Sequence, residues 1–97
     1  MIQHLCLIKF KQALDIDTQQ KVIDAYNKLP DLIPGIVSFR CGMDLSLLDG
    51  NWHFGISAEF ENQEAFQSYS VHPAQAEVIF PVVGELMEAY STMQFEV

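Results

Sequence analysis

Residues 52–60 alternate between large apolar side chains and smaller or polar ones, and no other segment constrains the fold as strongly. The apolar positions are Trp52, Phe54, Ile56, Ala58 and Phe60, and the positions between them are His53, Gly55, Ser57 and Glu59. Successive side chains of a β-strand point to opposite faces, so this alternation predicts a strand with one apolar and one polar face. The apolar face has to be covered, and we expect helices to lie over it.

A strand with a different pattern is predicted at residues 2–11. One of its faces carries Ile2, His4, Cys6, Ile8 and Phe10, and the other carries Leu5 and Leu7. Apolar side chains on both faces indicate that both are at least partly covered. Lys9 and Lys11 mark the solvent-exposed end of this strand.

The segment after this strand has the features of a helix that ends at a bend. We predict that Asp17 caps the helix, with Gln20 at the third helical position as in a capping box. The apolar positions recur at helical spacing and are Val22, Ile23, Tyr26 and Leu29. Pro30, Pro34 and Gly35 then end the helix. The chain continues into a strand at residues 36–44, which forms a hairpin with residues 52–60.

A second helical region follows the hairpin and is interrupted by a proline. Asn62 is predicted to cap a short helix that carries Phe66 and Tyr69. Pro73 suits the first position of a further helical segment, because its missing N–H group would have no partner there in any case. The apolar positions of that segment are Val78, Ile79, Val82, Val83 and Leu86. Pro81 is expected to kink it.

The order of predicted elements is β-α-β-β-α-β, with the last strand at roughly residues 90–97. This is the ferredoxin-like fold of the α+β class, and a chain of 97 residues is expected to form a single domain, 1–97. Helices cover only one face of such a four-stranded antiparallel sheet. The other face carries Leu5, Leu7, Arg40, Ser57 and Glu59. Because this face is too mixed for a dry core and too apolar at its two leucines for water, we expect a homodimer in which two sheets close an α/β barrel.

Charge and cysteine content narrow the range of partners. The formal net charge is −8, which argues against nucleic acid and anionic membranes as partners, since both need a cationic surface. No apolar run approaches the ~18 residues of a membrane span. Cys6 and Cys41 lie among apolar neighbours, and in the absence of a secretory signal we expect both thiols to be reduced. These features are typical of a cytoplasmic protein.

The chain also resembles a known family along its whole length. The segments that carry the likeness are Ile2-Gln3-His4 with Leu7-Ile8-Lys9-Phe10-Lys11, Leu32-Ile33-Pro34-Gly35-Ile36, Gly42-Met43-Asp44, Phe60 to Tyr69, His72-Pro73-Ala74, and Phe95-Glu96-Val97. Their order and spacing resemble the stress-responsive dimeric α/β-barrel (Dabb) proteins. The resemblance implies a ferredoxin-like fold and a homodimer with a β-barrel across the interface, so that residues 1–97 would be one Dabb domain.

The resemblance also implies a site. In a plant polyketide cyclase of this family, a Tyr and a His form an acid–base pair in a pocket between sheet and helices. By position, Tyr69 corresponds to that Tyr, Tyr26 to a further pocket Tyr, and His4 to a His on the first strand. The catalytic His of the cyclase corresponds to Gln75, which has no group that titrates near neutral pH. His72 matches a more general His of the family.

The candidate catalytic residues are therefore Tyr69, His72 and His4. Tyr69 could polarise a carbonyl as a hydrogen-bond donor, and either His could act as a general base. Each also has a structural interpretation: a core tyrosine, the cap of the helix that begins at Pro73, and a hydrogen-bonded core histidine. The predicted ligand-binding residues are Tyr26, Phe54, Ile56, Phe66, Gln75 and Ile79.

No metal or cofactor is indicated, because His4, Cys6, His53 and His72 lack a recognised ligand spacing and no Gly-rich phosphate loop or nucleophile elbow appears. Three functions stay open. The first is binding of a small hydrophobic or phenolic molecule. The second is a cofactor-independent lyase, cyclase or isomerase reaction that uses Tyr69 with His72 or His4. The third is a structural stress-response role without a ligand. A cavity of ~300 Å³ or more beside these residues would favour the first two, and a filled core the third.

Overall fold

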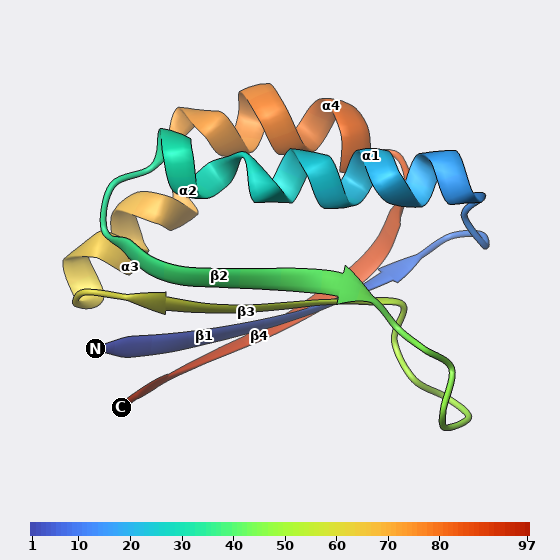
Figure 1. The fold of residues 1–97 in the computed structure, drawn as a ribbon, viewed down its shortest axis with the longest axis horizontal. Coiled ribbons are helices and arrows are strands. Elements are labelled where there is room, and N and C mark those ends of the chain that lie inside the picture. Colours follow the sequence, from blue (N-terminus) through green and yellow to red (C-terminus); the bar gives the residue numbers. More distant parts are fainter.

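Four antiparallel strands form one sheet in the order β2-β3-β1-β4, and the helices lie on one of its faces (Figure 1). The computed structural model describes residues 1–97. The elements are β1 (Ile2–Phe10), α1 (Ile16–Asn27), α2 (Leu29–Leu32), β2 (Ile36–Met43), β3 (Phe54–Phe60), α3 (Gln63–Ser70), the π-helical turn η1 (Gln75–Ile79), α4 (Phe80–Val83) and β4 (Met87–Glu96). The predicted β-α-β-β-α-β order and the ferredoxin-like α+β fold are confirmed.

The strand register places equivalent side chains in rows across the sheet. Cys6 of β1 pairs with Ile56 of β3 and with Thr92 of β4, and Ile56 pairs in turn with Cys41 of β2. Because paired residues point to the same face, these four residues form one row on the side that the helices cover. Both cysteines are free.

The core lies between this face of the sheet and the helices. Strand β3 alternates as predicted, with Phe54, Ile56, Ala58 and Phe60 buried. Strand β1 buries its helix-facing residues, whereas Leu7 on the open face is 49% exposed. Each large apolar side chain that is fully buried contributes about 1.5–3 kcal/mol, so the two central strands supply much of the stabilising area.

The beginning of α1 lies two residues earlier than predicted. Asp15 is the cap, and its Oδ1 accepts a hydrogen bond from the backbone N–H of Thr18 at 2.7 Å. Asp17 lies inside the first turn, where its charge faces the positive end of the helix dipole. The pattern offers two acidic residues two positions apart, and only Asp15 has the extended backbone that a cap requires.

The second helical region agrees with the prediction at its start. Asn62 caps α3, and its Oδ1 accepts a hydrogen bond from the N–H of Ala65 at 2.9 Å. Pro73 begins the next helical segment, as predicted. The last strand begins at Met87, about three residues before the predicted position. None of the helices is long and apolar enough to cross a membrane.

The π-helical turn η1 was not predicted. Within it, the N–H of Phe80 donates to the carbonyl of Gln75, five residues earlier. Pro81 has no N–H to donate to Glu77, so the regular hydrogen-bond ladder cannot continue through this segment. The widened turn places Gln75 and Ile79 over the same region of the sheet.

Candidate functional site

A cavity of about 370 Å³ lies between the sheet and the helices. Strands β1, β3 and β4 form one wall, and α1, α3 and η1 form the other. The lining residues are His4, Cys6, Ile8, Tyr26, Ile56, Phe66, Tyr69, Ser70, Gln75, Ile79, Met87, Tyr90 and Thr92. No side chain with a formal charge lines it, so the cavity is apolar with a few polar atoms, as small-molecule sites usually are.

Seven of the nine predicted site residues line this cavity. They are His4, Tyr26, Ile56, Phe66, Tyr69, Gln75 and Ile79. Phe54 does not, because its ring lies beneath Tyr26 in the packed core, with ring centroids 5.4 Å apart and a stacked geometry. Phe54 therefore supports a cavity residue and does not reach the cavity itself.

His72 also lies outside the cavity lining. Its Nδ1 accepts a hydrogen bond from the backbone N–H of Ala74 at 3.0 Å, and its carbonyl accepts from the N–H of Gln75 at 3.0 Å. This is the geometry of a cap on the helical segment that begins at Pro73. The structure thus places His72 in the structural role that the sequence left open beside the catalytic one.

His4 is buried in a cage of aromatic rings. Its ring centroid lies 4.8 Å from that of Phe66 and 5.9 Å from that of Tyr69. The side-chain amide Nε2 of Gln94 in β4 donates to Nδ1 of His4 at 3.0 Å. Burial lowers the pKa of His4, so its imidazole is neutral at pH 7. A neutral imidazole that accepts at Nδ1 carries its proton on Nε2.

Tyr69 is held on α3 by packing and by one side-chain contact. Its ring packs at 4.9 Å from that of Phe60, and the side-chain amide of Gln75 donates to its backbone carbonyl at 3.2 Å. Burial raises the pKa of Tyr69 to about 12, against a smaller opposing effect of the Gln75 side chain. The phenol is therefore protonated across the physiological range and can donate a hydrogen bond.

Several polar side-chain atoms of the cavity lining have no hydrogen bond within the protein, and the hydroxyl of Tyr26 and Nε2 of His4 are among them. Every fully buried side-chain nitrogen and oxygen atom has a partner, so neither of these two atoms is fully buried, and both residues line the cavity. Burial also raises the pKa of Tyr26, which keeps its hydroxyl protonated. Together with Tyr69, the cavity presents neutral hydrogen-bond donors on apolar walls.

Sequence reasoning missed the role of Gln94. The residue lies on the helix side of β4 directly opposite His4, with which it pairs in the register of β1 and β4. Alternation in the last strand places Gln94 and Thr92 on one face, but only the register shows which side chain of β1 they meet.

No group of three or more His, Cys, Asp or Glu residues is arranged to hold a metal ion.

The fold and the cavity together define a class: ferredoxin-like α+β proteins with a cavity of small-molecule size between one sheet face and its helices. The family model for the stress-responsive A/B barrel (Dabb) domain matches residues 2–97. The chain belongs to this family.

Curated relatives and solved structures agree with this assignment. The chain is 30% identical to the stress-response A/B barrel domain-containing protein HS1 of Arabidopsis thaliana over 89 residues, which cover 88% of this chain and 80% of that protein. It is 28% identical to olivetolic acid cyclase of Cannabis sativa over 76 residues, or 75% and 74% of the two chains. A dimeric ferredoxin-like protein of unknown function from Thermobifida fusca superposes with a TM-score of 0.86 at 27% identity, covering 99% of this chain and 90% of that one.

Proposed function

We propose that this protein is a homodimeric Dabb domain, residues 1–97, that binds a small, uncharged, largely apolar molecule in the cavity between sheet and helices. The observation that carries the proposal is the set of unpartnered polar atoms. The hydroxyl of Tyr26 and Nε2 of His4 belong to residues that line a largely apolar cavity of about 370 Å³, and neither atom has a hydrogen bond inside the protein. Polar atoms placed in this way fix the orientation of a ligand.

The chemistry of the walls selects the class of ligand. The Tyr26 and Tyr69 hydroxyls are protonated, and the Nε2–H of His4 is a donor, so a carbonyl or phenolic oxygen has three groups that can donate to it. The rings of Phe66 and Tyr69 offer faces for a planar or aliphatic body. A carboxylate would enter without any cationic partner and would pay a large desolvation cost.

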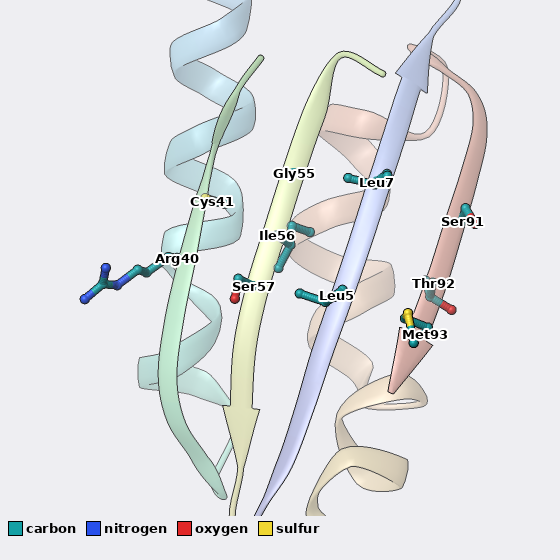
Figure 2. Close-up of a pocket in the computed structure, with 10 residues that line it drawn as sticks. All are labelled: Leu5, Leu7, Arg40, Cys41, Gly55, Ile56, Ser57, Ser91, Thr92 and Met93. Carbon is teal, nitrogen blue, oxygen red and sulfur yellow. The ribbon is translucent and has the colours of Figure 1, made fainter. Parts of the chain in front are cut away.

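The dimer is proposed through the open face of the sheet. Figure 2 shows this face, on which Leu5 and Leu7 project from β1 toward β3 and Met93 lies on β4. Between them is a shallow hollow of about 510 Å³. Arg40 also lines the hollow, but its side chain extends from β2 away from Leu5 and Leu7. Support also comes from the Thermobifida fusca protein, which is dimeric and shares the fold.

Catalysis is the second candidate, favoured by Tyr69 in the cavity and by the likeness to olivetolic acid cyclase. The difficulty is the base. His72 caps a helix outside the cavity, Gln75 does not titrate, and His4 carries its proton on the nitrogen that faces the cavity. A lyase, cyclase or isomerase reaction that starts with proton abstraction therefore lacks an acceptor, whereas binding needs none.

The free thiols of Cys6 and Cys41 fit a cytoplasmic location.

A ligand screen tests the proposal. Phenols, aryl ketones and medium-chain aldehydes should raise the melting temperature of the wild type, because a ligand that binds only the native state stabilises it. Tyr69→Phe should reduce the shift for oxygen-bearing ligands more than for plain hydrocarbons. Ser68→Ala removes a hydroxyl from an exposed position of the same helix and should leave the shift unchanged. No shift across such a library would support the structural role without a ligand.

A further inference from the structure

The loop between β2 and β3 holds three leucines in the open. Leu45, Leu47 and Leu48 are 78%, 79% and 73% exposed, which makes them the most exposed group of neighbouring apolar residues in the chain. We name residues 44–51 the β2–β3 arm. Three exposed leucines in one loop are unusual on a chain whose charge otherwise favours solubility, and such a group is typical of an interaction site.

The arm is ordered by its own hydrogen bonds. The carboxylate of Asp44 accepts from the backbone N–H of Ser46 at 2.8 Å and from the side-chain amide of Asn51 at 3.2 Å. Ser46 has a φ of 58°, a left-handed conformation that the Asp44 contact stabilises, and Gly50 has a φ of 80°. These contacts order the loop, in which Leu45 and Leu47 border a hollow on the side of Leu7 and Leu48 borders another beside Leu14 and Gln19.

The arm is continuous with the open face of the sheet. In Figure 1 it drops beyond the end of the strands on the side opposite to the helices. A hollow of about 560 Å³ is lined both by the arm residues Leu45 and Leu47 and by Leu7 of the open face, with Trp52 beside them. The arm and the open face thus share one hollow.

The shape of the open face favours one orientation of a second copy over another. Gly42 of β2 pairs with Gly55 of β3; an added Cβ would meet nothing within 4 Å at Gly42 and only Leu7, at 3.9 Å, at Gly55, so the β2–β3 half of the face is hollowed at this pair. The other half is a ridge, on which Leu5 of β1 pairs with Met93 of β4. A two-fold axis parallel to the strands places the β1–β4 ridge of one copy over the β2–β3 hollow of the other. An axis across the strands would stack ridge on ridge.

We propose that the β2–β3 arm docks on a second copy of this chain, at the end of the partner's β1–β4 ridge. An axis parallel to the strands keeps strand ends level, so the arm of one copy meets the end of β1 in the other. Two of the five basic residues of the chain, Lys9 and Lys11, lie at that end, and the arm carries Asp44 and Asp49. Two carboxylates of the arm would thus come near two lysines at the end of β1, where Glu88 of β4 is the neighbouring acidic residue. The inference rests on the proposed homodimer and adds its orientation and an anchoring element.

Trp52 is the only tryptophan and borders the hollow at the arm, so its fluorescence reports docking directly. We would measure mass by analytical ultracentrifugation and acrylamide quenching of Trp52 over the same dilution series of the wild-type chain. The arm variant replaces the three leucines with Ser. A matched control replaces three equally exposed apolar residues on the helix side: Ile16→Ser, Val71→Ser and Phe80→Ser. Circular dichroism would establish that both variants are folded.

We expect Trp52 of the wild type to be protected in the dimer and to become accessible as dilution produces monomer. The arm variant should dimerise with a dissociation constant at least about tenfold higher than that of the control. A dimer with accessible Trp52 overturns the inference without touching the proposed homodimer, and so does an unchanged dissociation constant in the arm variant, which would assign the arm to another partner. A wild-type monomer at all concentrations would overturn both.

Discussion

The side-chain amide of Gln94 lies 3.0 Å from Nδ1 of His4, and this contact joins the C-terminal strand to the cavity. Because Gln94 donates, it decides which nitrogen of His4 carries the proton, and it directs the Nε2–H toward the cavity. The ligand-facing chemistry of the first strand is thus set by a residue ninety positions away in the chain.

Replacement of Gln94 by Met tests this relationship. The change keeps the length of the side chain and removes the donor, so we expect a loss of about 1 kcal/mol in the free energy of unfolding, as for a partly buried hydrogen bond. Nitrogen chemical shifts of His4 should report the Nε2–H tautomer in the wild type and a mixture of tautomers in the variant. Gln67→Met on the exposed face of α3 serves as the control. If His4 keeps a single tautomer in the variant, Gln94 does not govern it.

The stability of the protein should depend on pH through His4. Burial lowers its pKa below the ordinary value of 6.5, so below that value the unfolded chain binds a proton that the native state resists. The free energy of unfolding should therefore fall as the pH drops below about 6.5 and should carry no such penalty above it. His4→Gln should flatten the dependence in this window. An equal slope in wild type and variant, measured by urea unfolding at several pH values, would contradict the assignment.

A charge at the centre of the open face should dissociate the dimer. Leu7→Asp places a carboxylate where the proposed interface is apolar, and burial of an unpaired charge costs several kcal/mol. Light scattering of the wild type at micromolar concentration should give twice the chain mass of 11.0 kDa, and the variant should give the mass of one chain. A variant that remains dimeric would place the interface elsewhere. A monomeric wild type would contradict the proposed dimer.

Gly35 should tolerate no side chain. Its φ is +90°, and a Cβ at this position would lie 2.6 Å from Cβ of Ala65 on α3. Gly35→Ala should therefore lower the free energy of unfolding by about 1–3 kcal/mol through backbone strain and overpacking. Ser68→Ala is the control, because Ser68 lies at an exposed position of α3 away from the proposed interface. Equal stability of both variants in urea would refute this packing argument.

The wild type should not close the ring of a linear polyketide, despite the presence of Tyr69. The carboxamide of Gln75 cannot accept a proton, and general-base assistance is typically worth about 10²–10⁴-fold in rate. Gln75→His should introduce such a group at a position that lines the cavity. Product formation followed by chromatography tests the pair. Ring closure by the wild type that is lost in Tyr69→Phe would show that another residue, with His4 the first candidate, serves as the base.

Local rules predicted most of the fold, because alternation in β3 and the Asn62 cap depend only on neighbouring residues. The cap of α1 was misplaced because Asp15 and Asp17 are both suitable cap residues and only Asp17 has a glutamine at the third helical position, whereas the backbone conformation decides for Asp15. The π-helical turn was missed because the effect of Pro81 on hydrogen bonds several residues earlier depends on the packing of the whole segment.

The site was predictable where a residue faces the cavity through strand alternation or helical spacing. His4 and Tyr26 are of this kind, and both line the cavity. Phe54 shares a face with Ile56, but it lies deeper under α1, which alternation alone does not indicate. His72 depends on the direction its ring takes at a helix break, and Gln94 on strand register, so neither could be assigned from local sequence.

The most direct test of the proposed binding is a crystal structure of the wild type grown with the phenolic or carbonyl compound that gives the largest thermal shift. We expect the compound in the cavity, with one oxygen within about 3.2 Å of Nε2 of His4 or of the hydroxyl of Tyr26 or Tyr69. Tyr69→Phe crystals grown in the same way provide the comparison. A compound bound only outside the cavity, or a cavity closed by the surrounding side chains, would contradict the account.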